Sequence, residues 1–362
     1  MLAACRTPVM GMHLYLCGHC GGLVPLYNSC GDRHCPKCQA GQRAAWLEKR
    51  RRELLPVEYF HVVFTVSHAL AALAVAHPWV FYTQLFRAVQ DTLLEIAASP
   101  EHLGAAIGGL MVLHTWGQNL HLHPHVHVIV PGGGLSPDGQ RWLACPRGFF
   151  LPVEVLSEVF RGKLLDYLKQ EHAAGRLPMS GGLADLAEPP RFASWLSSCY
   201  DTDWTVYAEP PKDRAPEQVL KYLARYTYRV AISNDRLESI DNGEVTFWYK
   251  DYAGGSRWER MTLDADEFLR RFLQHVLPPS FMRVRAFGFM ANRRRGEKLA
   301  LIRRLLGVPQ TPADASVDRP PTYRPCCPFC GEDALQFIGE TPRPSLRQLV
   351  ACMYPKKAPD SS

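Results

Sequence analysis

Apolar residues recur along most of the chain with the period of a helix or of a strand. Helical spacing extends over residues 78–98, 153–170 and 265–276. β-Branched and aromatic residues dominate residues 59–66 (YFHVVFTV) and 125–130 (HVHVIV), which predicts two strands. Helices and strands that mix in this way predict an α+β domain.

Shorter segments complete the predicted order of elements. Strands are expected at residues 110–114, 204–208, 229–233 and 245–250, helices at 44–55 and from Pro216 through EQVLKYLARY, and a loop at 177–190.

The composition is that of an ordinary globular protein, because 47% of the 362 residues are hydrophobic and 21% are charged. No stretch reaches eighteen uncharged apolar residues, the length that a membrane span needs. The first residues (MLAACRTPVMGMH) lack the basic and apolar regions of a secretory signal. We therefore expect a cytoplasmic protein with no membrane partner.

Positive charge is modest in total but concentrated in two segments. The 41 Lys and Arg residues exceed the 35 Asp and Glu residues, for a formal net charge of +6. Basic clusters can replace counterions along a phosphate backbone, so we expect DNA contacts from them, with solvated helix faces as the alternative. The basic residues concerned are Arg43, Lys49, Arg50, Arg51, Arg52, Arg293, Arg294 and Arg295.

Two Cys-x-x-Cys pairs stand near the start of the chain, Cys17 with Cys20 and Cys35 with Cys38. Each pair forms a knuckle that presents two thiolates to one ion, and two knuckles complete the closed tetrahedral site typical of structural zinc. We therefore expect one zinc ion bound by these four residues. Further candidates beside them are His19, Cys30 and His34.

The remaining cysteines have less defined surroundings. Cys327 and Cys330 (CPFCG) form a single knuckle, which cannot saturate zinc alone. Either Cys326 and Cys352 complete it, or its thiols bind no metal. Buried packing positions are expected for Cys5, Cys145 and Cys199.

Histidines crowd the segment HLHPHVH at residues 121–127. All four have the same parity, so on a continuous strand they would face one way. Because Pro124 is expected to break or begin the strand, His125 and His127 are the dependable pair. Two imidazoles on one face can chelate a divalent ion and leave positions open for a phosphate oxygen, with a structural role as the alternative.

Tyr222 and Tyr226 lie four residues apart on a predicted helix, so both hydroxyls project from one face. A tyrosine that attacks phosphorus forms a phosphotyrosine, which conserves the energy of the broken phosphodiester for rejoining. Lys221 and Arg225 are near enough to contact phosphates. The alternative is a helix with two buried aromatic rings and two surface charges.

The three motifs together resemble the rolling-circle transposases of the IS91 family, which includes the ISCR elements. The cysteine pairs with SCGDRHCPKCQ come first, then HPHVH, then KYLARYTYRVAIS, and the similarity extends from Cys17 to about Leu306. The resemblance implies an HUH endonuclease fold, which is an antiparallel sheet with packed helices, preceded by a small zinc-binding module.

The resemblance also implies residue roles. His125 and His127 match the His-hydrophobic-His motif, and Tyr222 and Tyr226 match the paired nucleophiles. Such enzymes nick one strand at an element end, form a 5′-phosphotyrosine and leave a free 3′-OH, usually with Mg²⁺ or Mn²⁺. The implied partners are single-stranded DNA at transposon ends and target DNA.

Some positions are less defined by the resemblance. For the third metal ligand we favour Gln118, since a His-His-Gln set is one known HUH arrangement, over His114 and His123. Tyr228 stands where relatives often carry His. The chain begins close to the zinc motif, whereas relatives often carry a preceding helical segment, as expected of an N-terminally truncated copy.

Other classes of protein share part of this pattern. A plasmid rolling-circle replication initiator or a relaxase would use the same histidines and tyrosines. A non-catalytic zinc-ribbon DNA-binding protein would need only the cysteines. A hydrolytic enzyme would use the histidines to activate water.

The motifs divide the chain into four expected segments. These are a zinc-binding module with a basic helix (1–55), an HUH-type catalytic domain (56–276), a basic DNA-contacting segment (277–310), and a Pro-rich linker with the CPFC knuckle and tail (311–362).

Overall fold

The computed structural model describes residues 4–32, 35–202, 204–209, 231–252, 254–308, 326–343, 345 and 348. The chain forms two compact units, one made of Met1–Lys49 with Pro312–Ser362 and the other of Arg50–Thr311. The expected segments 56–276 and 277–310 both lie in the larger unit, and the described residues 326–343 belong to the same unit as the N-terminal sheet. Among the described helices, none has the length and apolar run needed to cross a membrane.

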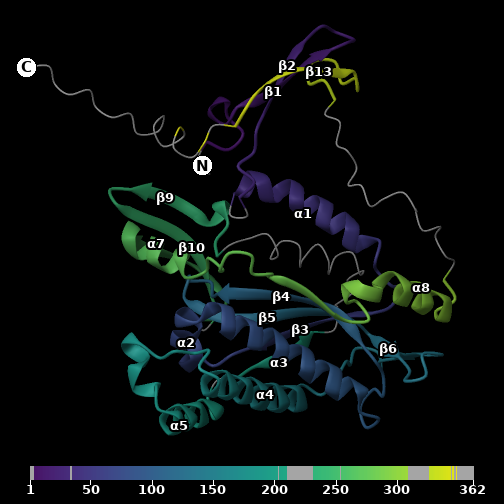
Figure 1. Cartoon of the computed structure of the whole chain (residues 1–362), viewed down its shortest axis with the longest axis vertical. Coiled ribbons are helices and arrows are strands. Elements are labelled where there is room, and N and C mark those ends of the chain that lie inside the picture. Colours follow the sequence, from purple (N-terminus) through teal and green to yellow (C-terminus); the bar gives the residue numbers. More distant parts are fainter. Residues whose placement is uncertain are drawn as a thin grey trace, which may run out of the picture. The chain divides into compact units, whose positions relative to one another are not determined.

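The smaller unit contains an antiparallel sheet in the order β13-β1-β2 (Figure 1). Its elements are a 3₁₀ turn at Pro8–Met10, β1 (Met12–Cys17), β2 (Leu23–Tyr27), β13 (Leu335–Thr341) and all but the last two residues of α1 (Pro36–Arg51). The buried clusters of this unit are built mainly around cysteines rather than large apolar side chains. A module with so small a core needs additional cross-links for stability.

The larger unit is built on an antiparallel sheet of five strands in the order β12-β4-β5-β3-β8. Its strands are β3 (Tyr59–Thr65), β4 (Gly108–Trp116), β5 (Leu122–Pro131), β8 (Val206–Glu209) and β12 (Val284–Gly288). β5 lies at the centre, and β12 brings the basic segment expected at residues 277–310 into the sheet.

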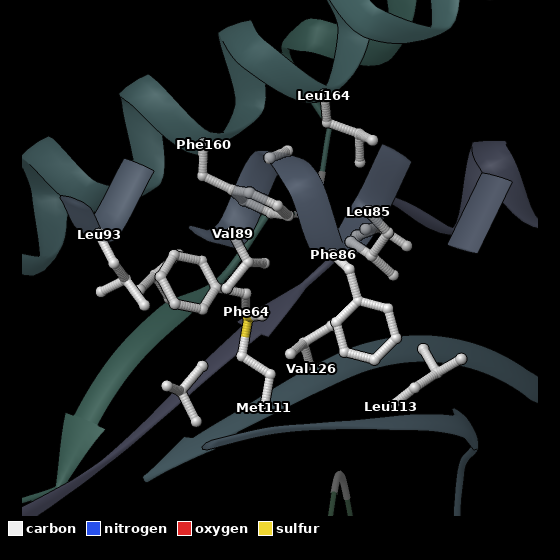
Figure 2. Packing of buried hydrophobic residues seen from close by; sticks show 14 of the residues in the cluster. Phe64, Leu85, Phe86, Val89, Leu93, Met111, Leu113, Val126, Phe160 and Leu164 are labelled. Atoms are coloured by element: carbon white, nitrogen blue, oxygen red, sulfur yellow. The ribbon is translucent and has the colours of Figure 1, made fainter. Parts of the chain in front are cut away.

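Helices α3 (Pro78–Ala98) and α4 (Val153–Ala173) cover one face of this sheet (Figure 1). Phe64, Val126 and Phe160 are fully buried in the core between them, which Figure 2 shows. Because side chains alternate along a strand, Val126 and Val128 enter this core while His125 and His127 face the other way.

The remaining elements surround this framework. They are a 3₁₀ turn at His68–Leu70, α2 (Ala71–Ala76), the hairpin of β6 (Gly133–Leu135) and β7 (Trp142–Ala144), a 3₁₀ helix at Gly181–Leu186, α5 (Pro189–Tyr200), a 3₁₀ turn at Asn234–Arg236, the sheet of β9 (Leu237–Asp241), β10 (Glu244–Asp251) and β11 (Arg257–Asp264), α7 (Ala265–Leu273), a 3₁₀ turn at Asn292–Arg294 and α8 (Arg295–Leu305).

The predicted fold class is confirmed: the protein is α+β, with an antiparallel sheet and packed helices. The strand at residues 59–66 and the helix at residues 78–98 are found nearly where they are predicted. Helix α5 is an addition, since its residues fall mostly beyond the predicted loop. A strand is predicted at residues 229–233. Its described part, residues 231–233, does not form a strand. The helix predicted from Pro216 lies outside the described residues.

Pro124 does not break β5, contrary to the expectation. The strand begins at Leu122 and passes through Pro124 without interruption. Pairing with β4 shifts register between His114 and Trp116, and pairing with β3 ends at His125. Pro124 therefore lies at an irregularity of the ladder, where a residue without a backbone N–H is tolerated.

Candidate functional site

Three histidines converge on the sheet face opposite the helical core. His114 on β4 lies directly across from His125 on β5, and His127 follows two residues later on the same face. The ligand atoms of the three side chains all lie within 4.8 Å of one another. We call this set the histidine triad. It confirms that β5 presents its histidines on one face and adds a third from the neighbouring strand.

The structure brings His114, one of the alternatives to Gln118, together with the two histidines of β5. Gln118 lies in the turn after β4, and its backbone carbonyl accepts a hydrogen bond from Arg236. His114 is a candidate for the third position, because the register of β4 against β5 places it opposite His125. His123 lies next to His125, with 5.2 Å between ring centroids.

Hydrogen bonds at the second ring nitrogen orient two members of the triad. Nδ1 of His125 lies 2.7 Å from the carbonyl oxygen of His123, so this nitrogen carries the proton. Nδ1 of His127 lies 2.7 Å from Nε2 of His61, a histidine on β3. In the tautomer that protonates Nδ1, both rings keep the Nε2 lone pair for an ion.

Burial keeps the triad neutral. It lowers the pKa of His125 to about 4 and holds the pKa values of His114 and His127 well below the ordinary value. Burial disfavours the charged, protonated form of each imidazole. A neutral imidazole has a free lone pair on one ring nitrogen, and a metal ion binds that form. The donor set therefore fits a divalent ion.

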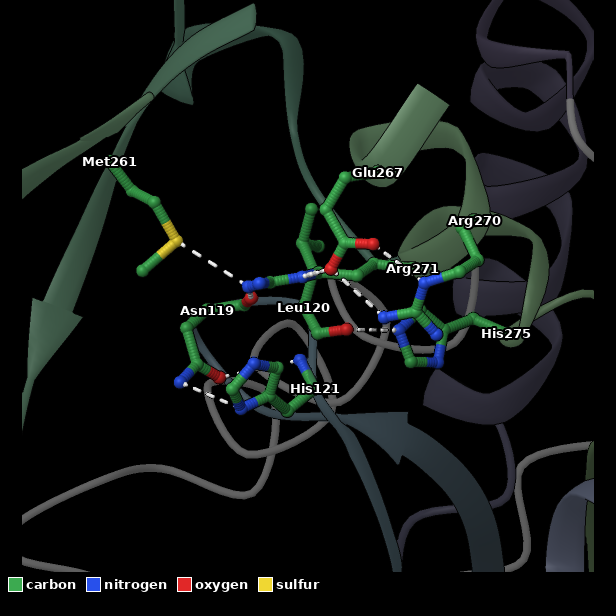
Figure 3. Close-up of polar contacts among 8 residues, drawn as sticks. All are labelled: Asn119, Leu120, His121, Met261, Glu267, Arg270, Arg271 and His275. Atoms are coloured by element: carbon green, nitrogen blue, oxygen red, sulfur yellow. Dashed lines mark hydrogen bonds and ion pairs between the residues drawn. The ribbon is translucent and has the colours of Figure 1, made fainter. Parts of the chain in front are cut away.

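The turn that joins β4 to β5 is held by side chains from the 3₁₀ turn before β9, from α7 and from the residues just after α7, as Figure 3 shows in part. Arg236 donates to the carbonyl of Gln118, Arg271 to that of Asn119 and His275 to that of Leu120. Three consecutive carbonyls are therefore bonded by side chains.

Leu120 is the apolar anchor of the same turn. Its side chain is fully buried in a second core with Phe247 and its backbone has a φ of 63°, which is unfavourable for a residue with a Cβ. Since the histidine strand begins two residues after Leu120, the bonded carbonyls and the buried Leu120 fix where β5 begins.

The cysteines form two clusters of four in the smaller unit. The helix cluster contains Cys5, Cys30, Cys35 and Cys38, and the ribbon cluster contains Cys17, Cys20, Cys327 and Cys330. In each cluster all four sulfur atoms lie within 4.8 Å of one another.

The clusters correct the expectation of one site with both Cys-x-x-Cys pairs. Cys17 and Cys20 belong to one cluster, and Cys35 and Cys38 to the other. The reason is that β13 pairs with β1 and brings the second knuckle of the ribbon cluster to the first. Cys5 is a cluster member rather than a packing residue, and neither Cys326 nor His19 belongs to a cluster.

Not all of the expected DNA-contacting residues face solvent. Arg50 is buried and forms an ion pair with Glu53 at 2.8 Å, and Arg295 contacts the same carboxylate at 3.1 Å. These two guanidinium groups therefore hold the start of the larger unit to α8. Exposed side chains among the expected set are those of Lys49, Arg51, Arg52, Arg293 and Arg294.

Five other predicted site residues cannot be placed. Tyr222, Tyr226, Lys221 and Arg225 lie outside the described residues, and of Arg43 only the backbone, within α1, is described.

His61 was not anticipated as part of the site. The sequence gives one indication of it: His61 is a polar residue within the otherwise apolar strand segment YFHVVF, and its neighbours on that strand are buried.

Comparisons with known proteins agree with these observations. Residues 108–298 match the family described as "Putative transposase", and residues 1–66 match the transposase zinc-binding domain of IS91 elements. The protein y4qJ of Sinorhizobium fredii (strain NGR234), which carries the same description as the first family, is 52% identical over 320 residues, 88% of this chain and 80% of y4qJ. The transposase of insertion sequence element IS801 from Pseudomonas savastanoi pv. phaseolicola is 29% identical over 301 residues, 82% of this chain and 70% of that protein.

Solved structures give a weaker likeness. Metal-free and metal-bound structures of the conjugative relaxase TrwC with oriT DNA align at 16% and 17% identity, with TM-scores of 0.24 and 0.25. They cover 48% and 50% of this chain and 68% and 66% of the relaxase chains. At these scores the likeness carries no weight for function.

Proposed function

The chain belongs to the IS91 family of transposases, and we propose that it nicks and transfers single-stranded DNA through a 5′-phosphotyrosine intermediate during rolling-circle transposition. The observation that carries this proposal is the histidine triad on the central strands of an antiparallel sheet. Buried imidazoles whose ligand atoms lie this close together, and which burial keeps neutral, can present their lone pairs to one divalent ion.

His114, His125 and His127 would hold the divalent ion of this reaction, Mg²⁺ or Mn²⁺. When bound there, such an ion polarises the scissile phosphate toward attack. His61 orients His127 through the hydrogen bond between their rings, and the carbonyl of His123 orients His125. The protein thus supplies three nitrogen donors, two of which are oriented by these hydrogen bonds.

Tyr222 and Tyr226 are the proposed nucleophiles. The phenol of one of them gives up its proton and its oxygen attacks phosphorus, which forms a bond to the 5′-phosphate. The bond between phosphorus and the 3′ oxygen breaks, and that oxygen takes up a proton and becomes the free 3′-OH. The phosphotyrosine retains the energy of the broken bond, which allows a second 3′-OH to displace the tyrosine and rejoin the strand. The second tyrosine serves strand transfer or termination.

Contacts to DNA are proposed for the exposed basic residues of both units. Lys49, Arg51, Arg52, Arg293 and Arg294 are the described members of this set, and Arg43, Lys221 and Arg225 complete it. A structural zinc ion in the helix cluster would stabilise the start of α1, which carries part of this basic surface.

A covalent-adduct assay tests the proposal. Single-stranded oligonucleotides that carry an element end are incubated with the protein and Mg²⁺, and the adduct is located by mass spectrometry after digestion. We expect DNA on Tyr222 or Tyr226 and no adduct from His125→Ala. An adduct that persists in the double Tyr→Phe variant contradicts the tyrosine assignment. Cleavage with no adduct indicates hydrolysis, and binding with no metal-dependent cleavage indicates a non-catalytic DNA-binding protein.

A further inference from the structure

The two knuckles of the ribbon cluster have the same sequence pattern and the same backbone. Each reads Cys-x-x-Cys-Gly, at residues 17–21 and 327–331. The carbonyl of Cys17 accepts from the N–H of Gly21 at 2.9 Å, and that of Cys327 accepts from Gly331 at 2.8 Å. The final glycines have φ values of 70° and 80°. Two matched knuckles that face each other are the arrangement of a zinc ribbon.

The sulfur positions fit a metal site and not a pair of disulfides. Sγ of Cys17 lies 3.7 Å from Sγ of Cys330, and Sγ of Cys20 lies 3.6 Å from Sγ of Cys327. Tetrahedral zinc with Zn–S bonds of about 2.3 Å places its sulfurs about 3.8 Å apart. A disulfide needs about 2.05 Å.

The surrounding packing explains how residues so distant in sequence meet. β13 pairs with β1 from Met12 opposite Thr341 to Cys17 opposite Leu335, so the second knuckle is delivered beside the first. A Cβ on Gly22 would lie 2.6 Å from the ring of Phe329, which shows how closely the knuckles approach. Among the described residues, Cys17, Val24 and Cys327 form the buried part of this cluster.

We propose that Cys17, Cys20, Cys327 and Cys330 bind a zinc ion of their own, which fastens residues 326–343 to the N-terminal sheet. Cys327 and Cys330 lie outside both family matches, which cover residues 1–66 and 108–298. It is separate from the helix cluster, which has its own four thiolates. The protein therefore carries two structural zinc ions, and the segment after the linker is part of the zinc-binding module.

Metal content of the purified full-length chain tests this inference independently of DNA cleavage. We expect two zinc ions per chain in the wild type and one in Cys327→Ser/Cys330→Ser. The matched control is Cys326→Ser, because Cys326 adjoins the knuckle, is exposed and belongs to neither cluster. It keeps both ions. Cys30→Ser/Cys38→Ser loses the other ion. The proposal is overturned if Cys327→Ser/Cys330→Ser holds as much zinc as the wild type.

Alkylation of the wild type gives an answer even where a variant does not fold. In the zinc-loaded protein Cys326 is labelled quickly, while the four ribbon thiols are protected and become reactive together when a chelator removes zinc. The proposal is overturned if Cys327 and Cys330 react as fast as Cys326 before chelation, or if intact mass shows two hydrogens lost for a disulfide. Cys330→His keeps four ligands, so it retains zinc, and its cobalt-substituted form shows a shifted absorption band.

Discussion

Nε2 of His61 lies 2.7 Å from Nδ1 of His127, and the two rings are nearly parallel, with an interplanar angle of 4°. His61 is on β3 and His127 on the adjacent strand β5, so the bond crosses the centre of the sheet. Both side chains are buried. The partner of the second nitrogen fixes the tautomer and orientation of a ligating imidazole.

Replacing His61 with Ala is expected to weaken Mn²⁺ binding about 10- to 100-fold, because His127 loses the group that orients it. Calorimetric titration of Mn²⁺ measures the effect, and nicking should recover largely at saturating Mn²⁺. His102→Ala, which removes an exposed histidine, is the control. Unchanged Mn²⁺ affinity in His61→Ala would show that His61 does not position the ligand.

The identity of the third ligand gives a second prediction. His114→Ala should abolish measurable binding of one divalent ion, since two imidazoles alone hold Mg²⁺ or Mn²⁺ poorly. Gln118→Ala should keep that binding, because only the backbone carbonyl of Gln118 is used to hold the turn. The same titration compares the two variants. The reverse order of effects would restore Gln118 as the ligand.

Arg271 and Arg270 form a matched pair on α7. Both contact Glu267, but only Arg271 also donates to the carbonyl of Asn119, at 3.3 Å. Arg271→Ala should lower the free energy of unfolding by about 1–3 kcal/mol, because a charged donor is lost from a part-buried carbonyl. Arg270→Ala, an exposed residue, should cost less than about 0.5 kcal/mol. Urea denaturation measures both, and equal costs would contradict a special role for the turn.

His275 predicts a dependence of stability on pH. Burial lowers its pKa from the ordinary 6.5 to about 4, so the folded state resists the proton that the unfolded state accepts. The stability that depends on neutral His275 is complete above pH 6.5 and is lost as the pH falls toward 4.

His275→Gln removes this titration while keeping groups that can bond Thr115 and the carbonyl of Leu120. Urea denaturation between pH 4 and 8 should therefore show a smaller loss of stability in acid for the variant, by roughly 3 kcal/mol at most. The histidine triad contributes the same dependence on pH to the wild type and to the variant, so its contribution cancels when the two stability curves are compared. Parallel curves would show that His275 accepts a proton in the folded protein.

Local patterns were enough to predict part of the site. Parity along HPHVH places His125 and His127 on one face, and the alternating valines identify the opposite face as core. His114 could be named only as one candidate, because its position opposite His125 depends on the register between two strands. That register is set by a turn with a buried Leu120 at positive φ, which no periodicity reveals.

The cysteine knuckles show the same limit at longer range. Each Cys-x-x-Cys is visible in the sequence, but its partner is chosen by strand pairing between segments that are 313 residues apart at Cys17 and Cys330. Charge has a related limit: Arg50 and Arg295 look like DNA contacts in the sequence, yet both pair with Glu53.

The pairing of β13 with β1 imposes an order on biosynthesis. A ribosome adding about 5–20 residues each second needs on the order of 15–60 s to pass from Cys17 to Cys330. During that interval the edge of β1 that later pairs with β13 has no β13 to pair with. The larger unit is synthesised within the same interval, before Cys330 is reached. The larger unit thus has time to fold before the ribbon can close, and a nascent chain that stalls in the linker after α8 presents an unpaired strand edge to chaperones and proteases.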